Sequence, residues 1–304
     1  FTRSILCVPV VNKEGKVIGC TQVLNKSGGK FTDEDESRLK AFTQQVAIAL
    51  ENAKLFEDVS KSRKYNEKAK YQIALIGKGV LFDSGGYSLK SPAGMETMKT
   101  DMSGAASAWG VINLVARTNQ DIGLTVYTPI VENMVSGSAI RPGDVLKARN
   151  GKTIEVLNTD AEGRLIMADA LAFAAESNPD LICDIATLTG ASYVALGLDV
   201  GAVFSNNKDV ESKFIEAAKN TYEDFHSLPL YSKYRKLIDS DIADMKNTGG
   251  RFGGAITAAL LLQEFIGDNK WMHLDIAGPA RSDNRKGATG FGVLSLYEYF
   301  KSLS

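Results

Sequence analysis

The sequence contains few of the residues that mark several common protein classes. Only three cysteines occur in 304 residues, far apart and in apolar segments, so no disulfide framework is indicated. Such cysteines are typical of buried thiols in a reducing compartment, and we therefore expect a cytoplasmic protein. There is no apolar run of about 18 residues and no signal-peptide pattern, which argues against a membrane span.

The chain also has almost no net charge and contains few histidines. The formal net charge is -1, which leaves no basic footprint for nucleic acid or for an anionic membrane, so we expect neither as a partner. His226 and His273 are the only histidines. Because a single catalytic zinc usually has histidine ligands, a metal site in this chain would instead be rich in oxygen ligands.

The residues that are present predict a soluble globular protein with more than one part. At 44% hydrophobic and 23% charged residues the chain can bury a sizeable core, and its length exceeds one domain of about 100–200 residues. Residues 1–59 predict a hairpin, a capping box that begins at Thr32, and a long amphipathic helix. Residues 60–70 are rich in lysine and arginine and predict a linker.

Residues 71–304 alternate apolar strands with helices, and this alternation predicts an α/β fold with a mixed sheet flanked by helices. We expect strands at 71–76, 124–131, 181–187 and 271–276, the second of them buried. We expect helices near 165–175, 209–220, 255–266 and 292–301, and a hairpin around Asn150-Gly151. Polar residues should then gather in the loops at the strand ends.

One heptapeptide, residues 158–164, holds Asp160, Glu162 and Arg164 at alternate positions. In an extended segment residues two apart point the same way, so these charges could meet at one point. The alternative is a solvated acidic loop with Gly163 as a turn residue. Taken alone, the heptapeptide does not decide between them.

Other polar residues follow predicted strands and strengthen the first alternative. Lys78, Asp83 and Asp101 could join Asp160 and Glu162 as ligands. Shared carboxylates suit two divalent cations about 3.5–4 Å apart, and a lysine can be a ligand only when it is neutral. Taken singly, Lys78 would be a surface lysine and Asp101 a helix cap. We interpret Asp184 as a structural acid, and Asp275 as structural or surface.

Segments 77–86, 98–106, 158–165 and 184–191 resemble the motifs of the leucyl aminopeptidase family, from about residue 72 to the end. The resemblance implies a catalytic role for Lys90 and Arg164. It implies metal ligation by Lys78, Asp83, Asp101, Asp160 and Glu162. It implies substrate contacts by Met98, Thr187, Leu188 and Gly190.

That family hydrolyses the N-terminal residue, preferably leucine or a similar apolar residue, from a peptide through a hydroxide that bridges two metal ions. The resemblance therefore implies two manganese or zinc ions, a peptide substrate and assembly as a homohexamer. Lys90 would stabilise the developing oxyanion. Arg164, too basic to accept a proton itself, would anchor a bicarbonate ion that does so.

The first residues resemble a different family, the cyclic-nucleotide-binding GAF domains. The signature residues are Asn25, Lys26, Phe31, Asp35 and Glu36, and only the C-terminal half of such an α+β domain is present. The family implies a salt bridge between Lys26 and Asp35. Two alternatives to the enzyme follow, a cyclic-nucleotide-binding regulatory module and a truncated inactive fusion. A fragment without a ligand is favoured, because most nucleotide contacts in the family come from the absent half.

Overall fold

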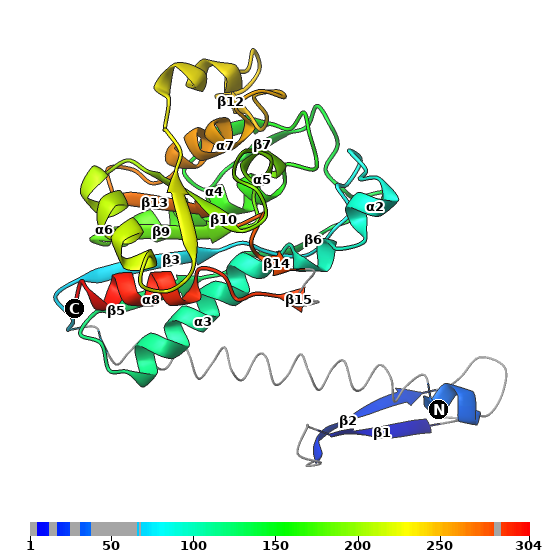
Figure 1. Cartoon of the computed structure of the whole chain (residues 1–304). Helices are drawn as coiled ribbons and strands as arrows, with labels where there is room; N and C mark the ends of the chain where they lie inside the picture. The colour runs from blue at the N-terminus through cyan, green and yellow to red at the C-terminus, as the bar shows by residue number, and fades with distance from the viewer. Residues whose placement is uncertain (1–4, 12–16, 25–30, 38–65, 67, 283–286) are drawn as a thin grey trace. The chain divides into compact units, whose positions relative to one another are not determined.

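The computed structural model describes residues 5–11, 17–24, 31–37, 66, 68–282 and 287–304 (Figure 1). The chain divides into two compact units, Phe1–Tyr65 and Asn66–Ser304. Within the described residues, none of the helices has the length and apolar character needed to cross a lipid bilayer.

The first unit contains the predicted hairpin. Strands β1 (Ile5–Val11) and β2 (Val17–Leu24) pair antiparallel. Residues 33–37 are helical and begin with the predicted capping box, in which the Asp35 amide donates to Thr32 Oγ1 at 3.4 Å and the Thr32 amide donates to Asp35 Oδ2 at 2.8 Å. Asn25, Lys26 and the rest of the predicted helix lie outside the described residues.

The second unit is built on a six-stranded sheet with the order β11-β10-β13-β9-β3-β5. Its strands are β3 (Gln72–Gly77), β5 (Gly123–Tyr127), β9 (Leu181–Ala186), β10 (Val200–Ser205), β11 (Asp224–Ser227) and β13 (Trp271–Asp275). Strand β10 runs antiparallel to β13, and the other neighbouring pairs are parallel. The sheet is therefore mixed, as predicted. The central strands β9 and β13 are buried along their whole length because helices cover both faces.

Helices flank this sheet on both sides (Figure 1). On one side lie α4 (Gly163–Ala175), α5 (Gly190–Leu196) and α7 (Gly254–Gln263), and on the other α3 (Ser103–Arg117), α6 (Lys208–Ala218) and α8 (Val293–Lys301). Small residues let α3 approach the sheet closely, since a Cβ at Gly104 would lie 2.2 Å from the Ile185 carbonyl oxygen. This close approach fixes Asp101, just before α3, beside the ends of β3 and β9.

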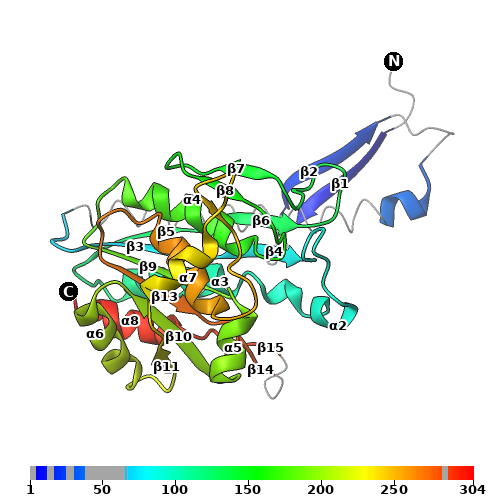
Figure 2. The same cartoon turned by 90° about the horizontal axis from the view of Figure 1, so that it is seen from above.

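One strand prediction was wrong. The segment expected as a single buried strand at 124–131 is two strands, β5 in the central sheet and β6 (Ile130–Asn133) in a small sheet with β4 (Gly79–Asp83). Pro129 lies between them and has no amide hydrogen to continue the ladder. Strands β4 and β6 lie side by side (Figure 2), and most of β6 is exposed rather than buried.

Short elements complete the unit. They are α2 (Pro92–Met95), the 3-10 helices η2 (Met98–Thr100) and η3 (Ser232–Ile238), and strands β7 (Val145–Lys147), β8 (Thr153–Glu155), β12 (Met245–Lys246), β14 (Arg281–Ser282) and β15 (Gly287–Ala288). Strands β7 and β8 form the hairpin predicted around Asn150-Gly151, and Gly151 has a φ of +90° in its turn. Strand β12 pairs with β8 and leads directly into Asn247.

Candidate metal centre

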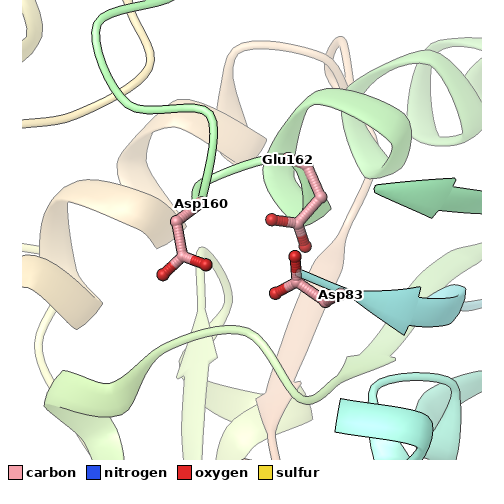
Figure 3. Close-up of side chains that lie close together, drawn as sticks. All are labelled: Asp83, Asp160 and Glu162. Atoms are coloured by element: carbon pink, nitrogen blue, oxygen red, sulfur yellow. The ribbon is translucent and has the colours of Figure 1, made fainter. Parts of the chain in front are cut away.

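Three carboxylates converge where β4 ends and α4 begins. Asp83, Asp160 and Glu162 each offer an oxygen within 4.8 Å of the others, and Figure 3 shows their carboxylates pointing toward one another. Asp83 is the last residue of β4, and the other two lie in the loop that enters α4. A cluster of carboxylate oxygens suits hard divalent cations.

A glycine turn brings the two segments together. Gly85 has a φ of +86°, and a Cβ there would lie 2.5 Å from the Ser88 carbonyl oxygen and 2.8 Å from Asp160 Oδ1. A residue with a side chain would therefore push Asp160 away from Asp83. Across the same contact, Thr159 Oγ1 donates to the Gly85 carbonyl at 2.6 Å.

The heptapeptide is not extended, so the prediction of an extended segment was wrong. Glu162 has helical angles, φ -68° and ψ -36°, and Arg164 lies in the first turn of α4. The Ala161 amide donates to the Asn158 carbonyl at 3.2 Å, which closes a turn instead of a strand. Asp160 and Glu162 still face a common point because the chain turns between them, whereas Arg164 is directed elsewhere.

Lys78 lies between the carboxylates of Asp101 and Glu162. Its Nζ is 2.8 Å from Asp101 Oδ1 and 3.0 Å from Glu162 Oε1, and it donates to the Thr187 carbonyl at 2.9 Å. Burial works to lower the pKa of Lys78, but the charges of Glu162 and Asp101 outweigh it and raise the pKa. Lys78 is therefore charged in this arrangement, and it would have to lose its proton to bind a metal.

The surroundings of Asp101 show whether the site fits a metal. Burial raises the pKa of Asp101 to about 7, although Lys78 counteracts this effect. Its Oδ2 atom is buried, and no partner for it is found among the described residues. A buried carboxylate oxygen without a donor is costly unless a cation neutralises it. The acidic donor set and this atom together fit a divalent metal.

Lys90 occupies the equivalent place between Asp83 and Asp160. Its Nζ is 2.8 Å from Asp83 Oδ2 and also forms an ion pair with Asp160. Burial works to lower the pKa of Lys90, but hydrogen bonds to Asp160 and Asp83 outweigh it and raise the pKa. Burial also raises the pKa of Asp160, against the effect of Lys90. Lys90 thus lies against the carboxylates of Asp83 and Asp160.

Arg164 is buried behind this cluster. Its Nη1 donates to the Asn247 carbonyl at 2.9 Å, and its buried Nε has no hydrogen-bond partner in the described part of the chain. Burial lowers the pKa of Arg164 to about 10, although Glu162 and Asp275 counteract this effect. The side chain is still a cation near neutral pH, with a donor free for an anion.

The residues expected to contact substrate lie around the same cluster. Thr187 Oγ1 donates to Asp101 Oδ1 at 2.8 Å, and the Leu188 amide donates to Asp275 Oδ1 at 3.1 Å. Gly190 is exposed at the start of α5. Met98 opens η2, and its carbonyl accepts from the Asp101 amide at 3.3 Å. Of the four residues, Thr187 and Met98 therefore bond directly to Asp101, while Leu188 bonds to Asp275.

Two asparagines were not predicted from the sequence. Asn133 Nδ2 donates to Asp83 Oδ1 at 2.8 Å and to the Thr159 carbonyl at 2.9 Å. Asn247 Oδ1 accepts from the Asn158 amide at 3.2 Å, while its Nδ2 donates to the Asn158 carbonyl. Asn133 lies two residues after the apolar run that ends at Val131, much as Asp83 follows Phe82, and that position was a usable signal. Asn247 had none, because its role depends on a contact distant in sequence.

Comparison with known proteins identifies two family matches. The model of the cytosol aminopeptidase family catalytic domain, Peptidase M17, matches residues 37–297. A GAF domain model matches residues 1–50, in agreement with the partial GAF domain expected from the sequence. The two matches overlap, because the first begins inside the second.

Individual relatives agree with the first match. The chain is 49% identical over 233 residues to a "Probable cytosol aminopeptidase" of Clostridium perfringens, covering 75% of this chain and 47% of the relative. It is 42% identical over 285 residues to a protein of the same description from Chloroherpeton thalassium, covering 91% of this chain and 56% of the relative. The chain spans about half the length of the curated relatives it matches.

Solved structures resemble about three quarters of the chain. The bottromycin maturation enzyme BotP superimposes with a TM-score of 0.73 at 39% identity, covering 77% of this chain and 52% of that one. A structure of BotP in complex with Mn superimposes with a TM-score of 0.74, also at 39% identity, covering 76% of this chain and 53% of that one. The six-stranded mixed sheet with helices on both faces is thus an arrangement found in known structures.

Proposed function

The chain belongs to the cytosol aminopeptidase family, and on this basis we propose that it is a two-metal aminopeptidase that removes an N-terminal residue, preferably leucine or a similar apolar residue, from peptides. One observation carries the proposal: three carboxylates lie within 4.8 Å of one another, beside a buried oxygen of Asp101 that has no donor among the described residues. This arrangement is costly without cations and is suited to holding them.

The residues that would hold the two ions are Lys78, Asp83, Asp101, Asp160 and Glu162. Manganese or zinc would suit these ligands, and BotP, a structural relative, has been solved with Mn. When bound, the ions would polarise the scissile carbonyl and lower the pKa of a water molecule. Glu162 lies near both Lys78 and the other two carboxylates, which suits a ligand shared between ions.

The two remaining cations would act on the reacting groups. Lys90 lies beside Asp83 and Asp160 and is partly open to solvent, so it could reach an oxygen on which negative charge develops. Arg164 has a buried Nε without a partner in the described residues, which supports a role in holding a small anion such as bicarbonate. That anion would accept the proton of the attacking water.

The substrate would lie along the border of the site. Met98, Thr187, Leu188 and Gly190 are proposed to contact its first residue, because the segment from Thr187 to Gly190 leads away from Asp101. A free amine is required in this mechanism, so internal peptide bonds should not be cleaved. The amine requirement gives the assay a natural control.

The test uses the chain loaded with manganese. Purified protein should hydrolyse leucine p-nitroanilide and should leave N-acetyl-leucine p-nitroanilide intact. Manganese content, determined by elemental analysis, should rise with activity, and a chelator should remove both. A folded, manganese-loaded protein with no turnover would contradict the proposal.

Assembly, boundaries and location belong to the same proposal. Family resemblance supports a homohexamer in the cytoplasm, and light scattering after size-exclusion chromatography tests the assembly. We propose residues 60–70 as a linker between a GAF-like segment, 1–59, and the aminopeptidase domain, 71–304. The division of the chain between Tyr65 and Asn66 falls inside this linker and supports it. Proteolysis at the linker should release a folded, metal-binding fragment.

The match of residues 1–50 to a GAF domain supports a second candidate function, cyclic-nucleotide binding. We expect it to fail for residues 1–50 alone, because they resemble the C-terminal half of such a domain and most nucleotide contacts in that family come from the other half. Isothermal titration with cyclic AMP and cyclic GMP should give no heat at micromolar protein. Measurable heat would favour a regulatory role for the first unit.

A further inference from the structure

Asp275 ends the central strand β13 and has an unusual set of partners. It is only 1% exposed, and its carboxylate accepts three hydrogen bonds. Oδ1 accepts from the Leu188 amide at 3.1 Å and from the Ala277 amide at 3.2 Å, and Oδ2 accepts from Thr189 Oγ1 at 2.6 Å. These donors stabilise a buried negative charge without a metal. Two of them belong to the segment proposed to contact substrate.

Thr187, at the start of that segment, is hydrogen-bonded to two proposed metal ligands. Thr187 Oγ1 donates to Asp101 Oδ1 at 2.8 Å, and Lys78 Nζ donates to the Thr187 carbonyl at 2.9 Å. Consecutive residues are thus fixed from two sides, by proposed metal ligands at Thr187 and by Asp275 at Leu188. The distance between the metal centre and the substrate segment is set by both attachments.

Thr189 connects Asp275 to helix α5 by hydrogen bonds. Thr189 is the N-cap of this helix, and its Oγ1 accepts from the Ser192 amide at 3.1 Å. The same hydroxyl donates its hydrogen to Asp275. Asp275 therefore fixes the direction of the hydroxyl and, with it, the position of Gly190 at the start of the helix.

We propose that Asp275 is a positioning residue for substrate binding, which holds residues 188–190 at the proper place beside the metal centre. The inference rests on the proposed aminopeptidase function. Asp275 does not share the cluster of Asp83, Asp160 and Glu162, although its charge acts on Arg164, so we assign its role to the segment proposed to contact substrate and not to the ions. Its loss should weaken substrate binding and leave metal binding intact.

Asp184 is a matched control. It is also fully buried, and it lies on β9, the neighbouring strand. It accepts from Trp271 Nε1 at 2.7 Å and is paired with His273 Nδ1 at 2.5 Å, both on β13, and among the described contacts it bonds to neither Leu188 nor Thr189. An Asp→Asn change at either position removes one buried charge and keeps the shape. Only the change at Asp275 should alter substrate binding.

The experiment compares Asp275→Ala, Asp275→Asn and Asp184→Asn, each loaded with manganese. For Asp275→Ala the KM for leucine p-nitroanilide should rise about 10-fold to 100-fold, as expected for displaced contacts to a non-reacting part of the substrate, with a much smaller change in kcat. The dissociation constant of free leucine, measured by calorimetry, should rise in parallel. Asp275→Asn should recover part of the loss, because its amide oxygen can still accept from the Leu188 amide.

A second pair of variants keeps the test valid if Asp275→Ala does not fold. Thr189→Val removes the hydroxyl that bonds to Asp275, and Thr189→Ser restores it; only the first should raise KM. An unchanged KM in folded Asp275→Ala, or an equal rise in Asp184→Asn, would overturn the inference while wild-type turnover still supports the aminopeptidase. No turnover by the manganese-loaded wild type would overturn both.

Discussion

The two ends of the candidate metal centre have the same arrangement of charges but differ in burial. At each end a lysine lies between two carboxylates, Lys78 with Asp101 and Glu162, and Lys90 with Asp83 and Asp160. The Lys78 side chain is 4% exposed, whereas the Lys90 side chain is 17% exposed and that of Asp160 is 34% exposed. The same ionic chemistry is therefore closed at one end and partly open at the other, where Lys90 and Asp160 reach solvent while the side chain of Asp83 is only 4% exposed.

The difference has a structural cause. Lys78 follows β3, which is covered on both faces, and it contacts Thr187 at the end of the neighbouring strand β9. Lys90 lies in the loop between β4 and α2 at the rim of the unit. Charges in the interior depend strongly on their partners, while charges near water are screened. The closed end should thus control stability, and the open end should be accessible to substrate.

Removing the residue that joins the two ends should have the largest effect. Glu162→Ala should lose bound metal and reduce kcat/KM by at least about 10³-fold, since a preorganised electrostatic group alone contributes up to that amount. Elemental analysis and the leucine p-nitroanilide assay check this result. Glu176→Ala is the control, because Glu176 caps the other end of α4 and is exposed in its pair with Arg149. Retained metal in Glu162→Ala would break the comparison, because the two ends would not share a ligand.

Substituting each lysine compares the ends directly. In metal-free protein, Lys78→Met should reduce the free energy of unfolding by about 3–5 kcal/mol, because it leaves buried carboxylates without a counter-ion. Lys90→Met should reduce the free energy of unfolding by a smaller amount, because water reaches Asp160. Urea unfolding in the presence of a chelator measures both variants. Equal losses would show that exposure does not distinguish the two ends.

Asn133 should influence the open end through Asp83. Asn133→Ala removes the donor to Asp83 Oδ1 and should weaken manganese affinity about 10-fold to 100-fold, as is typical for partners of metal ligands. Competition with a fluorescent chelator measures the affinity. Asn113→Ala serves as the control, since Asn113 donates only to the Trp109 carbonyl of its own helix in the described contacts. An unchanged affinity would show that Asp83 is oriented without Asn133.

The pair of Asp184 and His273 is a third ionic pair and is fully buried. Removing its charge should have the smallest of the predicted effects. Burial works to lower the pKa of His273, but the charge of Asp184 outweighs it and raises the pKa, with Asp275 adding to this and Arg164 opposing it. A raised folded-state pKa stabilises the protein below the unfolded value of about 6.5, and the contribution is lost as pH rises through the folded value.

Asp184→Asn tests this pair. The difference in unfolding free energy between wild type and variant should be larger near pH 5.5 than near pH 8.5, since the ion pair exists only while His273 is protonated. Urea unfolding at both pH values provides the measurement, and a difference independent of pH would mean that His273 stays neutral. The result would show whether the attraction between opposite charges accounts for most of the stabilisation by the buried Asp184–His273 pair.

Much of the fold could be predicted because it follows local rules. The apolar run 181–187 predicted a strand and the periodicity of 165–175 predicted a helix, where the structure has β9 and α4. The split of 124–131 could not be predicted from hydrophobicity, because β6 pairs with β4 outside the main sheet. A local signal did exist in Pro129, which interrupts that run.

By itself, the sequence determined which groups are available for chemistry: carboxylates and lysines in glycine-bordered segments, with two histidines that both lie outside them. Only the tertiary structure decided how they meet. Glu162 took helical angles at the N-cap of α4 instead of an extended conformation, Lys78 became buried and Lys90 did not, and Asp275 was linked to Leu188 and Thr189. The reason is physical, since residue type and local geometry depend on neighbours in the chain, while burial and hydrogen bonding depend on segments distant in sequence.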